Sequence, residues 1–314
     1  MRGRDGMLPL IVREIAPQTP SIVSIRLEDP AGAPLPAWEA GAHIDVQLVT
    51  RHERQYSLCG DPADASGYRI AVLREELSRG ASHYIHSFLR VGARVYVRSP
   101  RNMFPLADAR SYLLLAGGIG ITPMLAMARE LAARNADWRL LYLVRTRNDV
   151  AFAEELAGFG ERVQVHVSGE SSRIDIAEVL GSLAAGTDVY ACGPARLVDA
   201  LEERAALLPR GSALHVERFE PALRQFRPNV PFTLVCAASD VTVEVPAESS
   251  MLHALGGAGI ELPASCLRGV CGSCAVPLLE GQAEHRDSLG ADDASGIVYP
   301  CVSRALGPTL VIDA

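Results

Sequence analysis

Four cysteines in the last third of the chain have the number and spacing that an iron–sulfur cluster requires. Three follow the pattern C-x4-C-x2-C, and the fourth comes after 26 further residues; they are Cys266, Cys271, Cys274 and Cys301. A [2Fe–2S] cluster takes four thiolates, two on each iron. The alternatives are unrelated buried thiols or a zinc site, but zinc ribbons favour two C-x2-C pairs and only one occurs here. The spacing therefore predicts a [2Fe–2S] cluster.

Two glycines, Gly269 and Gly272, lie inside the cysteine loop. Without side chains they let the backbone approach the cluster and direct N–H groups at its sulfur atoms. With this loop, about 85 residues at the end of the chain resemble plant-type ferredoxins. The resemblance implies one-electron transfer, since a cluster of this kind cannot accept a hydride.

A glycine-rich turn at 117–123 follows an apolar strand at 112–116 and precedes helical spacing at 124–134. Its glycines, Gly117, Gly118 and Gly120, would let a pyrophosphate approach the N-terminus of the helix, where N–H groups and the helix dipole favour an anion. Pro123 stands where the dinucleotide fingerprint G-x-G-x-x-G needs glycine. The turn therefore predicts a nucleotide site of a different type.

The motif Arg54-Gln55-Tyr56-Ser57 lies at the end of a predicted strand. Arginine can balance negative charge on a flavin, tyrosine offers a flat face, and a serine hydroxyl can bond the edge where a hydride arrives. An exposed cross-strand pair is the alternative reading. With the sequence G-G-I-G-I-T-P at 117–123, the motif resembles the flavin-dependent NAD(P)H reductases of the ferredoxin-reductase superfamily.

This resemblance implies further contacts with the flavin. A strand at 71–74 would lie beside the ring, and a turn at 78–82 would bind the phosphate, unless it is an ordinary surface turn. Thr122 would orient the nicotinamide, and the aromatic residue at 219 would lie near the ring. The residues assigned to the flavin are Arg54, Gln55, Tyr56, Ser57, Ala71, Val72, Leu73, Arg79, Gly80, Ala81, Ser82, Thr122 and Phe219.

Within the superfamily, the chain resembles the phthalate dioxygenase reductase and vanillate demethylase reductase group. That group uses FMN rather than FAD and ends in a ferredoxin. Leu73 and Ala81 depart from its pattern, since a basic residue is common at the first position and the turn is richer in glycine. The resemblance implies FMN, with FAD as the alternative.

The nucleotide is assigned by the same resemblance to Gly117, Gly118, Gly120, Arg145, Cys192, Gly193 and Pro194. The last three match a C-G-P signature at a strand end, although Cys192 alone would suit a buried core. An acid after the second strand favours NADH, and arginine favours the 2′-phosphate of NADPH. Arg145, Arg147 and Asp149 all occur there. The resembled group implies NADH, with NADPH as the alternative.

The elements that must hold these residues form a multidomain fold. Short alternating strands punctuated by Gly, Pro and Asp predict an antiparallel β-barrel flavin domain at 1–106. Strands alternating with helical segments predict a nucleotide-binding domain at 107–228, built on a parallel sheet covered on both faces. The remaining segment, 229–314, is the predicted α+β ferredoxin domain, with a helix that begins after Ser249 or Ser250.

Composition narrows the class of protein. The 314 residues carry a net charge of −7, and residues 230–314 alone hold ten acids and three arginines. An acidic chain argues against nucleic acid as a partner. No apolar run is long enough to cross a membrane, and no apolar segment follows the first residues as in a signal peptide. We expect a cytoplasmic monomer.

The resemblance implies a reductase that passes electrons from NADH through FMN and the cluster, singly, to a Rieske-type oxygenase or demethylase of aromatic compounds. A cytochrome P450 or another acceptor is the alternative partner. A flavin- and cluster-containing redox sensor without catalytic activity is a further alternative. The acidic ferredoxin segment predicts electrostatic steering toward a positively charged partner.

Overall fold

The structure is a computed structural model that describes residues 6–48, 53–75, 80–222, 224–289 and 293–314. The chain divides into two compact units, Met1–Phe219 and Glu220–Ala314, each of which is described by itself. The first unit contains both the barrel and the parallel sheet. The domain limits 1–106, 107–228 and 229–314 stay a prediction.

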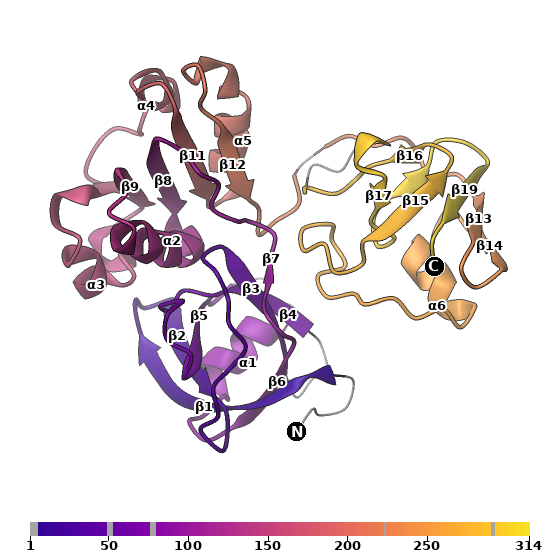
Figure 1. The fold of residues 1–314 in the computed structure, drawn as a ribbon, viewed down its shortest axis with the longest axis horizontal. Helices are drawn as coiled ribbons and strands as arrows, with labels where there is room; N and C mark the ends of the chain where they lie inside the picture. The colour runs from indigo at the N-terminus through magenta and orange to yellow at the C-terminus, as the bar shows by residue number, and fades with distance from the viewer. Residues whose placement is uncertain (1–5, 49–52, 76–79, 223, 290–292) are drawn as a thin grey trace. The chain divides into compact units, whose positions relative to one another are not determined.

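An antiparallel sheet forms the barrel of the first unit (Figure 1). Its strands are β1 (Leu8–Pro17), β2 (Ile22–Glu28), β3 (Ala42–Gln47), β4 (Glu53–Ser57), β5 (Gly67–Leu73), β6 (Arg94–Val97) and β7 (Arg101–Asn102), and the helix α1 is Ala81–Ser87. The strand order is β4-β3-β6-β1-β2-β5, with β7 paired to β3. An antiparallel bridge between Leu58 and Ile70 joins the two ends, so the predicted closure is confirmed.

A five-stranded parallel sheet with order β10-β9-β8-β11-β12 follows. Its strands are β8 (Ser111–Gly117), β9 (Trp138–Val144), β10 (Val163–Val167), β11 (Thr187–Cys192) and β12 (Leu214–Glu217). Its helices are α2 (Ile121–Ala133), α3 (Ala153–Ala157), α4 (Ile176–Gly181) and α5 (Ala195–Glu202), with short 3-10 turns at Gly118–Gly120, Arg147–Asp149, Gly160–Arg162 and Ala205–Leu207. The alternation predicted from sequence is confirmed.

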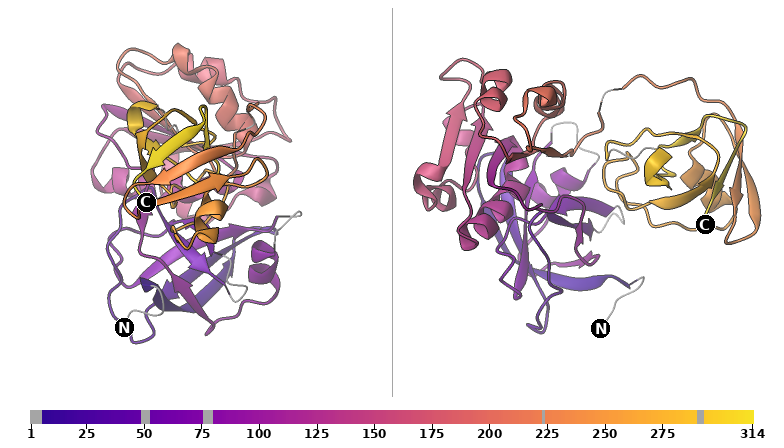
Figure 2. Two further views of the ribbon diagram at one scale, coloured as in Figure 1. Left: turned by 90° about the vertical axis from the view of Figure 1, so that its right-hand side faces the viewer. Right: turned by 45° about the horizontal axis from the view of Figure 1, so that its top comes forward.

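The two faces of this sheet belong to different hydrophobic cores. Leu114 and Ala116 of β8 pack with α2, whereas Leu113 and Leu115 pack with α4 and α5. Successive strand residues point to opposite faces, so a continuous apolar strand is buried on both sides. The helices that cover the sheet can be followed in Figure 2.

The barrel and the parallel sheet share one core and a polar clamp. The core that contains Ile44 and Ile70 of the barrel also contains Met124 of α2. Arg129 of α2 donates to Cys59 O at 2.7 Å and also pairs with Glu155 of α3. Glu155 in turn accepts from Arg69 of β5 at 2.6 Å. The barrel is therefore fixed against the sheet at several points.

The second unit is a small mixed sheet with one helix. Its elements are β13 (Phe232–Cys236), β14 (Val241–Val245), α6 (Met251–Gly257), β15 (Val276–Glu280), β16 (Ala283–Glu284), β17 (Ile297–Val298), β18 (Arg304–Ala305) and β19 (Thr309–Ile312), with a 3-10 turn at Asp293–Ser295. The sheet order is β14-β13-β19-β15-β17, and β16 pairs with β18. Ser250 caps α6 by accepting from His253 N at 3.2 Å, which decides between the two predicted caps.

Across the described part of the chain, no helix is both long and apolar enough to span a bilayer.

Candidate functional site

The glycine turn after β8 and the Cys192–Pro194 turn after β11 lie against each other. A Cβ atom on Gly117 would stand 2.8 Å from Pro194 Cδ, and one on Gly120 would stand 2.1 Å from Cys192 O. These two glycines are therefore required by the contact between the turns. Gly118 has φ +54°, which favours glycine, and no other atom lies within 4 Å of where its Cβ would stand. Both turns lie at the carboxyl ends of adjacent strands, where nucleotides bind in sheets of this type.

Thr122 closes the same turn. It is buried in the first turn of α2, and its hydroxyl donates to Ile119 O at 3.0 Å. This bond fixes the backbone between Gly118 and α2.

The barrel contributes the predicted flavin motif on β4. Ser57 Oγ donates to Glu217 Oε2 at 3.2 Å, across from the end of β12. Cys192 is the register partner of Glu217 in the neighbouring strand β11. The structure therefore brings together two predicted residues, Ser57 and Cys192, and a third that the sequence analysis missed.

Burial sets the protonation of this group of residues. It raises the pKa of Glu217 to about 7, with the hydrogen bond from Ser57 acting in the opposite direction. Burial also raises the pKa of the Cys192 thiol well above its ordinary value, so this thiol is neutral. A carboxylic acid at the end of the strand that pairs with the C-G-P strand was the signal in the sequence that could have identified Glu217.

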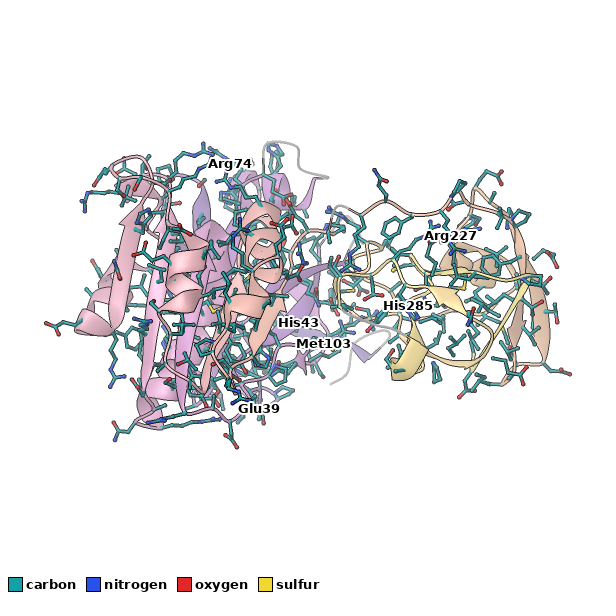
Figure 3. All side chains as sticks on the ribbon, turned by 90° about the horizontal axis from the view of Figure 1, so that it is seen from above. Glu39, His43, Arg74, Met103, Arg227 and His285 are labelled. Atoms are coloured by element: carbon teal, nitrogen blue, oxygen red, sulfur yellow. The ribbon has the colours of Figure 1, made fainter. Side chains whose placement is uncertain are left out.

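The other residues of the motif line the same strand. Tyr56 packs against the barrel core, and burial raises its pKa. The Gln55 Nε2 atom is buried without a hydrogen-bond partner among the described residues, so an amide donor is available. Arg54 donates to Glu53 O at 2.8 Å. His43, labelled in Figure 3, is the register partner of Ser57, and burial lowers its pKa to about 3, which keeps it neutral.

The predicted strand beside the flavin is β5. Ala71 and Val72 are buried, and His86 of α1 donates to Val72 O at 3.0 Å. Leu73 is the last residue of β5. Arg74, labelled in Figure 3, follows it and is exposed.

The predicted phosphate turn at 78–82 runs into helix α1, and its phosphate-binding role stays a prediction. Arg79 lies outside the described residues. Gly80 has φ +103° and precedes α1, but Ala81 and Ser82 already belong to the helix. Ser82 Oγ accepts from Glu75 N at 3.3 Å, so its hydroxyl connects the helix to the end of the preceding segment. A helix start was hidden because α1 has no side-chain cap.

Phe219 follows β12 and packs against the core that includes the barrel. The preceding residue, Arg218, is buried and forms ion pairs with Asp199 at 2.6 Å and Glu202 at 2.7 Å, both on α5. These ion pairs fix the backbone that carries both Glu217 and Phe219.

The predicted cofactor-preference segment follows β9. Asp149 Oδ2 accepts from the N–H and the hydroxyl of Thr146, both at 2.9 Å. Arg147 pairs with Glu170, which follows β10, whereas Arg145 is exposed and forms no ion pair with a described residue.

The four predicted cluster ligands lie in one loop region of the second unit as two contacting pairs. The Cys266 thiol is hydrogen-bonded to Cys271, and the Cys274 thiol is hydrogen-bonded to Cys301; all four cysteines are free of disulfides. The hydrogen bond from Cys266 lowers the pKa of the Cys271 thiol below its ordinary value. Among described residues, no three His, Cys, Asp or Glu side chains surround a point that one metal ion would occupy. Two pairs of thiols suit a cluster with two thiolates on each iron.

Backbone N–H groups surround these thiols. Arg268 N lies 3.3 Å from Cys266 Sγ, and Ser273 N lies 3.5 Å from Cys271 Sγ. Gly269 has φ +69°, and a Cβ atom there would stand 2.9 Å from Asp287 Cα. The tight loop therefore directs N–H donors at the sulfur atoms, and such hydrogen bonds set the reduction potential of a bound cluster.

Two family models match the chain. The model described as "2Fe-2S iron-sulfur cluster binding domain" matches residues 235–306, and the model described as "Oxidoreductase NAD-binding domain" matches residues 114–203. The first covers all four paired cysteines, and the second covers both nucleotide turns. The chain is therefore an oxidoreductase with an NAD-binding domain and a [2Fe–2S] domain.

Individual proteins match over nearly the full length. The β subunit of a heme-dependent oxidative N-demethylase from Ectopseudomonas mendocina (strain ymp) is 41% identical, covering 98% of this chain and 99% of its own. The solved phthalate dioxygenase reductase, described as modular for electron transfer from pyridine nucleotides to [2Fe–2S], is 38% identical with a TM-score of 0.73, covering 99% and 98%. An intact type IV self-sufficient cytochrome P450 monooxygenase is 41% identical with a TM-score of 0.91, covering 98% of this chain and 41% of that one.

Proposed function

This chain belongs to the family of phthalate dioxygenase reductase and vanillate O-demethylase oxidoreductase, and we propose that it carries electrons from NADH through FMN and a [2Fe–2S] cluster to an oxygenase. The observation that carries this proposal is the meeting of the barrel motif with the nucleotide turns. Ser57 of β4 bonds to Glu217 at the end of β12, directly beside Cys192. The paired cysteines supply the exit for electrons.

The residues of the barrel suit FMN. The unpartnered Gln55 amide offers a donor, Tyr56 offers a flat face, and Arg54 offers positive charge. Ala71, Val72 and Leu73 of β5 would lie along the ring, and Gly80, Ala81 and Ser82 near its phosphate. When bound, FMN accepts a hydride from NADH and gives up electrons one at a time to the cluster.

The hydrogen-bonded pair of Ser57 and Glu217 can accept the proton that is released when NADH is oxidised. A hydride that leaves as two electrons leaves one proton behind, and a buried site needs a group to take it. Glu217 has a pKa of about 7, so near neutral pH its carboxylate can accept a proton through the bonded Ser57 hydroxyl. The neutral Cys192 thiol beside it excludes water without adding charge.

The nucleotide turns position NADH. Gly118 leaves its backbone open, Gly117 and Gly193 bring the turns together, and Thr122 holds the turn in shape. The α2 N-terminus favours the pyrophosphate. Phe219, fixed through its neighbour Arg218, would lie against the flavin ring, where a nicotinamide must also approach.

The acceptor is proposed to be a Rieske-type oxygenase or demethylase of aromatic compounds, and the reductase a cytoplasmic monomer. The phthalate and vanillate relatives support the choice of acceptor. The seven free cysteines suit the reducing conditions of the cytoplasm. A heme acceptor is the second candidate, because the relatives include a heme-dependent N-demethylase subunit and the fused P450.

Reconstitution tests the proposal. The purified chain, loaded with FMN and cluster, is mixed with NADH and either a Rieske oxygenase or a P450, and product is measured for each. We expect turnover with the Rieske protein. Turnover with the P450 alone would replace the acceptor, and no NADH oxidation with any acceptor, cytochrome c included, would contradict the electron route.

A further inference from the structure

The loops after β9 and β10 form one wall at the carboxyl edge of the parallel sheet. Ser168 N donates to Val144 O at 3.0 Å, and Gly169 N donates to Arg145 O at 2.9 Å. A Cβ atom on Gly169 would stand 2.8 Å from Arg145 O, so only glycine allows this approach. The side chains that follow these backbone bonds are therefore held close together.

An ion pair between Arg147 and Glu170 joins the two loops. Arg147 donates from Nε to Glu170 Oε1 at 2.8 Å and from Nη2 to Oε2 at 2.7 Å. The side chains are 77% and 47% exposed. An exposed pair contributes little to folding stability, so its consequence lies in how it occupies the Arg147 guanidinium.

Glu170, and not Asp149, is the carboxylate that pairs with Arg147. Asp149 is turned back onto its own loop by two hydrogen bonds from Thr146. Glu170 stands on the neighbouring loop and occupies the full bidentate face of Arg147. Arg145, which directly follows β9, is exposed and forms no ion pair with a described residue.

In nucleotide-binding sheets of this kind, an acid at this edge bonds the ribose 2′-hydroxyl of NADH, and an arginine accommodates the 2′-phosphate of NADPH. We propose that Glu170 is the specificity-determining residue of this chain, because its bidentate pair with Arg147 keeps that guanidinium from a 2′-phosphate. The pair thereby favours NADH. This inference rests on the proposed function, in which the parallel sheet binds a pyridine nucleotide.

Glu170→Gln removes the charge and releases Arg147. The probes are 2′,5′-ADP, which carries the 2′-phosphate, and 5′-AMP, which lacks it, titrated calorimetrically into the flavin- and cluster-loaded chain. We expect affinity for 2′,5′-ADP to rise roughly tenfold, because a released guanidinium makes charge-assisted bonds to phosphate. Affinity for 5′-AMP should stay nearly constant. In turnover, kcat/KM for NADPH should rise relative to NADH. Equal changes for both probes, or none, would overturn the proposal.

Two further variants separate the roles. Glu178→Gln removes the same charge from an exposed position on α4 and should leave both probes unaffected. The double variant Arg147→Ala with Glu170→Gln should lose most of the gain, and a double variant that keeps it would overturn the part given to Arg147. If the proposed function were wrong, the wild-type chain would bind neither probe and would not oxidise NADH. If only this inference were wrong, wild-type NADH oxidation would be normal and the probe ratio unchanged.

Discussion

Glu217 links the flavin motif to the nucleotide sheet through a single hydrogen bond to Ser57. Its side chain is partly buried, and desolvation raises its pKa to about 7, whereas an ordinary glutamate is charged throughout the neutral range. A group that changes charge near neutral pH at this position can take up a proton during turnover. Replacing Glu217 with a residue that cannot titrate therefore tests this proton uptake.

Glu217→Gln should flatten the pH dependence of electron delivery. In the wild-type chain, Glu217 accepts a proton only when deprotonated, so the rate should rise with pH through about 7. The amide keeps the shape and cannot titrate. The measurement is NADH-driven acceptor reduction from pH 5.5 to 8.5, at saturating NADH. An unchanged rise in the variant would assign the ionisation to another group.

Cys274→Ser tests the electron exit. Serine removes one of four thiolates, so delivery to the oxygenase should fall about 100-fold or more, because the cluster is the one-electron carrier. Hydride transfer from NADH to the flavin should persist and can be followed by stopped-flow bleaching of the flavin. Cys236→Ser, in the same unit but outside the two thiol pairs, is the matched control. Full oxygenase turnover in the Cys274 variant would contradict the route.

At the scale of elements, Ser250 fixes the start of α6 through its bond to His253 N. Ser250→Ala should lower the stability of the second unit by about 1 kcal/mol, the usual cost of losing an N-cap. Loss of cluster absorbance on heating reports this unit directly. Ser249→Ala is the control, since its hydroxyl donates to Ser250 O at 3.3 Å and caps nothing. Equal losses in both variants would contradict the capping role.

Elements were predictable wherever periodicity or punctuation was strong. The apolar run of β8, the glycine turn and α2 follow directly from the sequence, because a strand buried on both faces must be apolar throughout. The start of α1 was not predictable, since Gly80 in a left-handed conformation replaces the usual Ser or Asp cap. The spacing of the cysteines identified the four candidate ligands, but their grouping into two pairs depends on the folded loop.

Contacts between residues that are far apart in the chain could not be predicted from the sequence. Ser57 and Glu217 are separated by 160 positions and lie on different sheets, so no local pattern relates them. The same applies to Arg147 and Glu170, which are joined only because β9 and β10 are neighbours in the sheet. Motifs predicted the type of chemistry, and the packing of strand ends determined which side chains take part.

At the scale of the whole molecule, charge is unevenly distributed along the chain. Residues 230–314 hold ten acids and three arginines, and two of these, Arg286 and Arg304, are engaged by Glu284 and by backbone carbonyls. An acidic surface raises the association rate with a basic partner, and salt screens this effect.

Reduction of cytochrome c, a basic acceptor, should therefore slow as salt is added. Raising ionic strength from about 50 to 300 mM shortens the screening length more than twofold, so kcat/KM for cytochrome c should fall several-fold. NADH consumption with a small neutral acceptor provides the control and should change little. A rate for cytochrome c that is constant or rises with salt would contradict electrostatic steering by this unit.

An anaerobic titration of the loaded chain with NADH, followed by absorbance and electron paramagnetic resonance, tests the central claim most directly. A flavin takes two electrons and a [2Fe–2S] cluster takes one, so the account predicts bleaching of both chromophores with about 1.5 NADH per chain and the signal of a reduced cluster. A chain that retains neither iron nor flavin after reconstitution, or a cluster that stays oxidised while the flavin is fully reduced, would contradict it.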